Sequence, residues 1–403
     1  MERFIARQPI LNEKLGVYGY ELLFRSGVEN FFHQQDGDQA SSRVIADSLL
    51  LFGMEALTHG AKAFINFTRR LLLEKYALTL PRSLTVVEIL ETVEPEAPVL
   101  EACRILKQKG FKLALDDFVQ RPDYAPLLEM ADIVKVDFLE SDGQEQQRLA
   151  ETLLPRGIVL LAEKVETQED FSRARSMGYT LFQGYFFSKP VIVARKDLPS
   201  SKLHYLRLLK EINAAQMDFD SLSRLVGTDA SMSYKLLRYI NSAAFGVRQQ
   251  VNSLKQAVTL LGENQIRQWA SLLAVYNLGD DRPVELMATA VIRARFSELL
   301  AAEAGLARHA PDLFLIGLFS LLDAMLGRPQ AEILEELNLG DDVTAALLKK
   351  EGRLALVLEL VKSYEQGRWE EVDQACAGLG LDKDHLPEQY LQAAQFASYT
   401  STA

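Results

Sequence analysis

The amino-acid sequence predicts two folds in succession, a TIM-like (β/α)8 barrel of the α/β class and then an all-α domain. Short β-rich apolar runs alternate with longer segments of helical spacing up to about residue 190, which is typical of a parallel sheet covered by helices. Beyond residue 201 the β-rich runs cease and only helical spacing continues. The length of 403 residues is enough for two or three domains with full-sized cores.

Seven β-rich runs define the predicted barrel. They cover residues 17–20, 63–65, 84–87, 112–115, 133–136, 158–162 and 179–182. Helical segments lie between them: residues 42–52 carry apolar side chains at helical spacing, and residues 98–110 end at a glycine in the C-cap position. Seven or eight such units predict a closed barrel, although about 190 residues is short for this fold.

The helical half begins after a linker. We place the barrel at residues 1–192, the linker at 193–201 and the all-α domain at 202–403. In residues 254–261 the apolar side chains follow the i, i+3, i+4, i+7 pattern, with Ser253 as the N-cap and Gly262 as the stop. Further helices are predicted at residues 203–212, 231–240, 313–325 and 354–364.

Composition restricts the classes of function. The formal net charge of −11 argues against a general nucleic-acid or anionic-membrane binder, because such proteins usually present a basic surface. The two cysteines, Cys103 and Cys376, form no Cys-x-x-Cys pair, which fits a reducing compartment. The N-terminus lacks the apolar run of a secretion signal, and the longest apolar stretch, residues 313–326, is too short to span a bilayer. We therefore expect a cytoplasmic protein with neither a nucleic-acid nor a membrane partner.

Polar side chains occur in or at the carboxyl end of every predicted strand. In chain order they are Glu21, Asn66, Glu88 with Glu91, the pair Asp116 and Asp117, Lys135 with Asp137, Glu163, and Gln183. Each alone could be a solvated turn former or a helix cap. In a barrel, however, all these ends open on one face, where they would form a ring of oxygen ligands around one lysine. Such a ring suits hard divalent cations such as Mg²⁺ or Mn²⁺, and the lack of histidine in it argues against zinc.

The same segments carry a family resemblance. Residues 20–25, Tyr-Glu-Leu-Leu-Phe-Arg, resemble the signature motif of the EAL domain, with Leu22 in place of the usual alanine. Residues 64–68, 87–91, 115–118, 134–137, 162–167 and 183–190 resemble its later motifs in order. EAL domains are TIM-like barrels that hydrolyse the bacterial messenger cyclic di-GMP to the linear dinucleotide, and the resemblance implies this fold and activity here.

The resemblance also implies a role for each polar residue. Two Mg²⁺ or Mn²⁺ ions per barrel would be held by Glu21, Asn66, Glu88, Asp116 and Asp117. Lys135 and Glu163 would be the catalytic residues, with Lys135 helping to deprotonate the attacking water. Arg25, Gln183 and Asp137 would bind the substrate, and Glu91 would anchor the loop that follows Asp117.

That loop departs from the family pattern. After Asp-Asp-Phe, active members usually continue with Gly-Thr-Gly, but here residues 119–124 read Val-Gln-Arg-Pro-Asp-Tyr. Glycines permit left-handed backbone angles that valine resists, and Pro122 stiffens the turn. In the family this loop couples substrate binding, metal affinity and dimerisation. The alternative to an active phosphodiesterase is therefore a weak or inactive barrel that serves as a cyclic di-GMP receptor or a signalling scaffold.

The helical half resembles a second family. Residues 236–246, Leu-Leu-Arg-Tyr-Ile-Asn-Ser-Ala-Ala-Phe-Gly, resemble the most characteristic stretch of the HDOD domain, a helical relative of the HD phosphohydrolases. Residues 317–323 stand where an HD enzyme would have Gly-Leu-Leu-His-Asp, and no His-Asp pair occurs in the sequence. The resemblance therefore implies a non-catalytic domain that contacts protein partners or relays a signal. A homodimer is one arrangement that the family resemblance leaves open.

Overall fold

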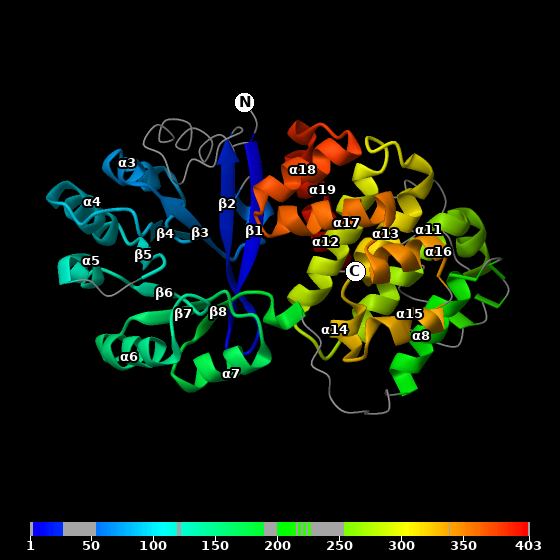
Figure 1. Ribbon diagram of the computed structural model, residues 1–403, viewed down its shortest axis with the longest axis horizontal. Coiled ribbons are helices and arrows are strands. Elements are labelled where there is room, and N and C mark those ends of the chain that lie inside the picture. The colour runs from blue at the N-terminus through cyan, green and yellow to red at the C-terminus, as the bar shows by residue number, and fades with distance from the viewer. Residues whose placement is uncertain are drawn as a thin grey trace. The chain divides into compact units, whose positions relative to one another are not determined.

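Figure 1 shows the computed structural model of the chain, which describes residues 3–26, 54–118, 122–188, 200–214, 217–218, 221–222, 225–226, 254–337 and 339–401. The chain forms two compact units, one built mainly from Met1–Lys189 and the other mainly from the residues from Pro190 onward. Most of the predicted linker, residues 193–201, lies outside the described residues, so the domain limits given above stay a prediction.

The first unit is a closed barrel of eight strands that follow one another in chain order. The strands are β1 (Arg3–Asn12), β2 (Val17–Ser26), β3 (Lys62–Phe67), β4 (Thr85–Ile89), β5 (Lys112–Leu115), β6 (Ile133–Asp137), β7 (Val159–Glu163) and β8 (Leu181–Gln183). The seven predicted runs overlap β2 to β8, and the structure adds β1. Strands β2 to β8 pair in parallel, as predicted, whereas β1 is antiparallel to both β2 and β8.

The reversed first strand follows from a tight turn. Only residues 13–16 separate β1 from β2, which is too short for a crossover helix, so the two strands must pair antiparallel. The side-chain oxygen of Asn12 closes the turn, because it accepts the backbone N–H groups of Lys14 at 2.9 Å and Gly16 at 3.0 Å. A fully parallel barrel, the expectation from the β-then-α alternation, is therefore wrong for this one strand.

Helices connect the parallel strands and lie on the outer side of the barrel (Figure 1). They are α2 (Met54–Thr58), α3 (Arg69–Leu73), α4 (Ala97–Gln108), α5 (Ala125–Leu128), α6 (Gly143–Leu153) and α7 (Gln168–Ser176), with 3-10 helices at Tyr76–Thr79, Pro122–Tyr124, Leu154–Arg156 and Phe186–Ser188. Helix α4 corresponds to the predicted helix at 98–110, and Gly110 just beyond it has a φ of 86°. The predicted helix at 42–52 lies outside the described residues.

A layer of apolar side chains fills the barrel interior. Its buried members are Ile10, Phe64, Val86, Ala114, Ile133, Leu161 and Leu181, one from each of β1 and β3 to β8. Tyr18 of β2 packs against them. Because successive side chains of a strand alternate between its two faces, the residue two positions further along each of β3 to β8 also points inward. The apolar layer is therefore the floor beneath the side chains at the strand ends.

The second unit is helical where the structure describes it, which confirms the predicted fold class. Its helices are α8 (Ser200–Ile212), α11 (Leu254–Leu278), α12 (Val284–Leu300), α13 (Ala310–Phe319), α14 (Leu322–Leu326), α15 (Gln330–Leu337), α16 (Asp341–Thr344), α17 (Gly352–Glu365), α18 (Trp369–Leu379) and most of α19 (Leu386–Ser401), with short 3-10 or π helices at Ala307–His309 and Ala345–Lys349. The 3-10 helix at Lys383–His385 belongs to the first unit.

Two predicted helix ends in this unit can be compared with the structure. Gly262 has non-helical angles, φ 73° and ψ 171°, so α11 consists of two helical segments that meet at the predicted stop. The predicted helix at 313–325 is wrong as a single element, because the backbone leaves the helix between α13 and α14. The predicted helix at 231–240 lies outside the described residues. Within the described part of the chain, none of the helices combines the length and the apolar character needed to cross a bilayer.

Candidate functional site

The predicted ring residues lie directly above the apolar layer. Each of Phe64, Val86, Ala114, Ile133, Leu161 and Leu181 is followed two positions later by Asn66, Glu88, Asp116, Lys135, Glu163 and Gln183, respectively. On the reversed strand β1 the relation runs backward, from Ile10 to Gln8, and Gln8 is the register partner of Glu21 on β2. The period of two in β-strands thus brings side chains from β1 and from β3 to β8 into the same end of the barrel, and the register pair Gln8–Glu21 adds β2.

Lys135 is the centre of this arrangement. Its Nζ lies 2.6 Å from Asp116 Oδ1, 2.8 Å from Glu88 Oε1, 2.9 Å from Glu163 Oε1 and 3.5 Å from Glu21 Oε2. The lysine side chain is 1% exposed and the Glu88 side chain 0%. Four carboxylates from four strands therefore share one buried ammonium group, so the site carries more negative than positive charge if all four are ionised.

Two amide side chains fix the two oxygens of Glu21, and one of them also bonds to a third amide. Asn66 donates its Nδ2–H to Glu21 Oε1 at 3.2 Å, and Gln183 donates its Nε2–H to Glu21 Oε2 at 2.6 Å. Gln183 also donates to Gln8 Oε1 at 2.9 Å. Gln8 is absent from the predicted site because β1 is not among the predicted runs. The feature of the sequence that could have identified Gln8 is its spacing of two residues from Ile10, on a strand that runs in the opposite direction.

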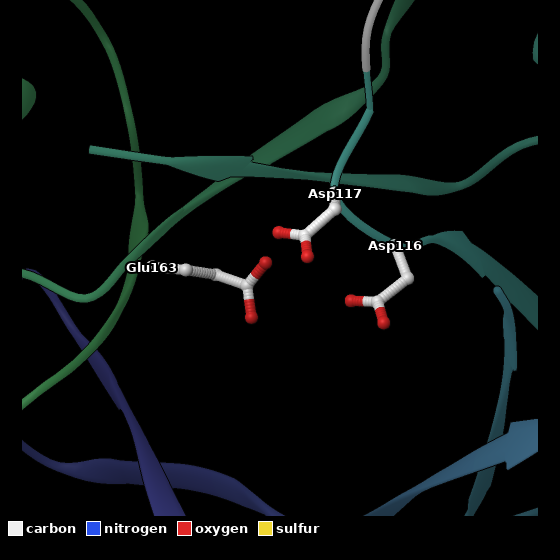
Figure 2. Close-up of side chains that lie close together, drawn as sticks. All are labelled: Asp116, Asp117 and Glu163. Atoms are coloured by element: carbon white, nitrogen blue, oxygen red, sulfur yellow. The ribbon is translucent and has the colours of Figure 1, made fainter. Parts of the chain in front are cut away.

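Asp116, Asp117 and Glu163 form a second group of carboxylates. It shares Asp116 and Glu163 with the four carboxylates around Lys135, which are called here the Lys135 hub. Each of the three offers a carboxylate oxygen, and these oxygens all lie within 4.8 Å of one another. Figure 2 shows the three carboxylates pointing toward a common space, from the ends of β5 and β7. Asp117 has a φ of 39°, in the left-handed region that non-glycine residues seldom occupy. Such strain is commonly found at functional sites.

Burial and crowding shift the acidity of the site. Burial raises the pKa values of Glu88 and Glu163 well above the ordinary range, although Lys135 opposes this effect. Burial also acts against ionisation of Glu21, but the Lys135 ammonium and the amide hydrogen bonds outweigh it and lower its pKa. Burial, together with the neighbouring Asp116 charge, raises the pKa of Asp117 to about 6. Burial disfavours the Lys135 ammonium, yet the surrounding carboxylates raise its pKa well above the usual value.

Several buried oxygens of the site have no hydrogen-bond partner among the described residues. They are Asn66 Oδ1, Glu88 Oε2, Glu163 Oε2 and Gln183 Oε1. A buried polar atom without a partner costs about 1–3 kcal/mol, so four of them in one site indicate a missing partner that is positively charged or donates hydrogen bonds. Carboxylate and amide oxygens are the ligands that Mg²⁺ and Mn²⁺ prefer. The residues present therefore fit divalent cations.

Asp137 takes part in a different set of contacts. Its Oδ1 accepts the backbone N–H groups of Leu139 at 2.7 Å and Glu140 at 3.1 Å, and its Oδ2 forms an ion pair with the ammonium of Lys164. The family resemblance implies substrate binding by Asp137, and the structure places its carboxylate in this turn. Lys164 follows Glu163 directly and has a φ of 51°. It is a second residue of the site region that the sequence pattern did not single out.

The remaining predicted residues lie at the edge of what the structure describes. Arg25 belongs to β2, but its side chain lies outside the described part. The Glu91 side chain is exposed. Residues 119–121 of the altered loop are not described, but Tyr124 at the loop's end is buried, and its hydroxyl donates to the backbone carbonyls of Glu91 at 2.8 Å and Val93 at 3.0 Å. In the described part, the contact between this turn and the loop is thus made through Tyr124 and backbone carbonyls.

Gly184 lets the last two strands of the site come close together. It has a φ of 142°, and a β-carbon there would lie 2.2 Å from the carbonyl oxygen and 2.5 Å from the nitrogen of Val165. The backbone of Val165 is hydrogen-bonded to Gln183 O at 3.0 Å. Only glycine leaves room for this approach, which holds the Glu163 turn beside Gln183.

The fold and the ring define a class: an α/β-barrel protein with an oxygen-donor cation site at its strand ends, joined to a helical domain. Comparison with known proteins agrees. Residues 21–190 match the EAL domain family and residues 198–326 match the HDOD domain family. The chain is 37% identical over 397 residues to the cyclic di-GMP phosphodiesterase CdgJ of Vibrio cholerae serotype O1, covering 98% of this chain and 92% of that protein.

Two further likenesses were found. The uncharacterized protein YuxH of Bacillus subtilis strain 168 is 38% identical over 406 residues, covering 98% of both chains. Among solved structures, the manganese and cyclic di-GMP complex of BlrP1 from Klebsiella pneumoniae aligns with a TM-score of 0.39 and 25% identity, over 46% of this chain and 55% of that one. The chain belongs to the family of proteins that join an EAL domain to an HDOD domain. EAL domains use divalent metals, in accord with the donor set described above.

Proposed function

We propose that the barrel hydrolyses cyclic di-GMP to the linear dinucleotide with two divalent cations, and that the helical domain regulates it through protein contacts. The observation that carries the proposal is the set of four carboxylates around buried Lys135, with unpartnered oxygens beside them. The name of the Vibrio relative, which aligns over 98% of this chain, supports the same reaction.

The metal ligands proposed for this reaction are Glu21, Asn66, Glu88, Asp116 and Asp117, with Mg²⁺ or Mn²⁺ as the cations. Asn66 Oδ1 and Glu88 Oε2 are two of the buried oxygens that lack a partner among the described residues. When bound, two divalent cations supply an activated water and neutralise the charge of the phosphodiester. Asp116 is the candidate bridging ligand, because it belongs both to the Lys135 hub and to the grouping with Asp117 and Glu163.

Lys135 and Glu163 are the proposed catalytic residues. In the ring as described, Lys135 is the counter-ion of four carboxylates, and these carboxylates keep it protonated. Bound cations would compete for the same carboxylates, so Lys135 would lose its proton to solvent more easily. The neutral amine would then accept a proton from the attacking water. Glu163 lies 2.9 Å from Lys135 and orients this water. Arg25, Gln183 and Asp137 stay the proposed substrate contacts, and Glu91 the proposed anchor of the loop.

The test is a hydrolysis assay on the full chain. Purified protein is incubated with cyclic di-GMP and either Mn²⁺ or Mg²⁺, and the linear product is separated by chromatography. We expect wild-type protein with metal to form the linear dinucleotide. We expect no linear dinucleotide from the Asp116→Asn variant or from wild-type protein in excess chelator. No product from wild-type protein, under conditions where an established EAL enzyme is active, would contradict the proposal.

One observation favours the alternative of a receptor, namely the replacement of the loop glycines at residues 119–124. Calorimetry with cyclic di-GMP in Ca²⁺, which usually blocks turnover by EAL domains, distinguishes the remaining cases. Binding without turnover indicates a receptor, and no binding indicates a scaffold. Sedimentation of the full chain, with and without cyclic di-GMP, tests the proposed homodimer.

A further inference from the structure

Lys164 occupies an unusual backbone conformation at the edge of the site. It follows Glu163 at the end of β7 with a φ of 51°. For an L-residue other than glycine this left-handed region is unfavourable. A glycine at this position would avoid the strain, so the presence of lysine suggests that its side chain has a role.

The Lys164 ammonium is held by one buried carboxylate of the site region. It forms an ion pair with Asp137 Oδ2, and its charge also acts on Asp117. Asp137 is buried, with a side chain 6% exposed, whereas the Lys164 side chain is 49% exposed. Burial opposes its charge, but the hydrogen bond to Asp137 and the nearby acidic groups Asp137, Asp117 and Glu140 raise the pKa of Lys164, so it stays cationic.

This cation differs from Lys135 in its position. Lys135 lies inside the ring and contacts Glu21, Glu88, Asp116 and Glu163. Lys164 comes one residue after Glu163, and its ammonium pairs with Asp137, the register partner of Glu163. It therefore belongs to the side of the ring where Asp116, Asp117 and Glu163 converge, called here the Asp117 side. A positive charge at that side repels a divalent cation that binds there, and it leaves the Glu21 and Asn66 side of the ring less affected.

We propose that Lys164 is a positioning residue that weakens divalent-cation binding on the Asp117 side of the ring, by holding a positive charge against Asp137 one residue after Glu163. The inference rests on the proposed two-cation function. Its consequence is regulatory: the two cation positions differ in affinity, so the fraction of fully loaded protein follows the free cation concentration.

The test measures Mn²⁺ binding by calorimetry on the full, chelator-treated chain without cyclic di-GMP. Lys164→Gln removes the charge and keeps a long polar side chain, while Lys164→Arg keeps the charge. Lys75→Gln is the matched control, because Lys75 also has a left-handed φ, 55°, and lies before β4 begins rather than at a strand end.

We expect Lys164→Gln to tighten the weaker Mn²⁺ binding step by roughly three- to tenfold, the size expected for one partly screened charge near a divalent ion. Lys164→Arg and Lys75→Gln should bind like wild type. The difference should shrink at higher ionic strength, since salt screens an exposed charge.

Two results would overturn the inference alone: a weaker-step affinity in Lys164→Gln that is equal to or below that of wild type, or the same tightening in Lys164→Arg. The first would mean that the charge does not repel the cation. The second would mean that backbone geometry, rather than charge, sets the affinity. No Mn²⁺ binding by wild type or any variant would instead overturn the proposed function together with this inference.

Discussion

The barrel and the helical domain both contain partly or wholly buried charges, but they treat them differently. In the barrel, Lys135 faces four carboxylates, and several oxygens around it lack partners among the described residues. In the helical domain, Ser320 donates to the carbonyl of Gly317 at 2.7 Å and accepts from buried Arg293 at 3.2 Å. Asp323 accepts the backbone N–H of Ala324 at 2.8 Å.

The barrel site has more hydrogen-bond acceptors than donors, whereas the polar groups of residues 317–323 in the helical domain find partners close by. The family resemblance implies that residues 317–323 correspond to the metal-binding segment of an HD phosphohydrolase. Their polar groups Ser320 and Asp323 bind the helices' own backbone and Arg293. Over the described ranges, the one group of three acidic, histidine or cysteine side chains with metal-ligand spacing is in the barrel. That the helical domain has no hydrolase chemistry stays a prediction, and the following substitutions compare the two regions.

The largest effect is expected from removing the central cation of the barrel. Lys135→Met should lower hydrolysis of cyclic di-GMP by about 10²- to 10⁴-fold, the usual contribution of a positioned acid or base. Without metal it should also lower the free energy of unfolding by about 3–5 kcal/mol, because buried carboxylates lose their counter-ion. Urea denaturation with and without Mn²⁺ measures this loss, which should shrink when Mn²⁺ supplies positive charge.

Lys362→Met is the matched substitution in the helical domain. Lys362 is partly buried and pairs with Glu359 at 3.1 Å, and its pKa is lowered by burial and by the charge of Arg293. A neutral side chain of similar length should therefore be tolerated, with a change in stability below about 1 kcal/mol and no dependence on Mn²⁺. Equal stability losses in the two variants would show that the contrast between the regions has no energetic basis.

The second effect concerns the close approach of β7 and β8. In Gly184→Ala, the added β-carbon would meet the backbone of Val165, so we expect a loss of about 2–4 kcal/mol in unfolding free energy. Mn²⁺ affinity should fall as well, because Glu163 and Gln183 are displaced. Gly157→Ala is the control, with a φ of 77° but open space around it, and should cost only about 1 kcal/mol while leaving Mn²⁺ affinity unchanged. If both variants bind Mn²⁺ equally well, the glycine does not position the site.

The sequence predicts some parts of this architecture better than others, for physical reasons. The strand-end residues, such as Glu88 and Asp116, could be assigned to one face because parallel strands of a barrel end on the same side. Gln8 could not, because its strand runs the other way and its alternation differs little from that of a surface hairpin. Tyr124 was missed because it binds backbone carbonyls, and a backbone acceptor leaves no mark in the sequence. Lys164 was missed because a left-handed φ at a lysine has no sequence signature.

A third, smaller effect is expected where Tyr124 fixes the altered loop. Tyr124→Phe removes two hydrogen bonds to the carbonyls of Glu91 and Val93 and should cost about 1–2 kcal/mol in stability. It should also raise the KM for cyclic di-GMP, because the loop's end is released. Tyr179→Phe is the control: it loses one buried hydrogen bond, to the Gln146 carbonyl at 3.1 Å, just before β8 begins and away from the carboxyl ends of the strands.

The pair of tyrosine variants also decides how the loop is anchored. A raised KM in Tyr124→Phe but not in Tyr179→Phe would support anchoring through the backbone of the Glu91 turn. Glu91→Gln keeps that carbonyl and should then change KM little. If instead Glu91→Gln raises KM and Tyr124→Phe does not, the Glu91 carboxylate is the anchor, as the family resemblance implies.

The smallest effect is the pH dependence contributed by Asp117 in chelator-treated protein. Burial and the Asp116 charge raise its folded-state pKa to about 6 from an ordinary value near 4, so the folded chain holds this proton more tightly than the unfolded chain. Its contribution to stability is therefore complete below about pH 4 and is lost as the pH rises through about 6. Asp117→Asn should remove that part of the pH profile and be slightly more stable than wild type at pH 7 in chelator. Thermal unfolding between pH 4 and pH 7 measures this pH dependence. Identical slopes of stability against pH for both proteins would mean that Asp117 is not destabilised by its neighbours.

Added Mn²⁺ should reverse the order of stability of wild type and Asp117→Asn at pH 7, because only the carboxylate gains a cation. No substitution in the helical domain should show such a reversal.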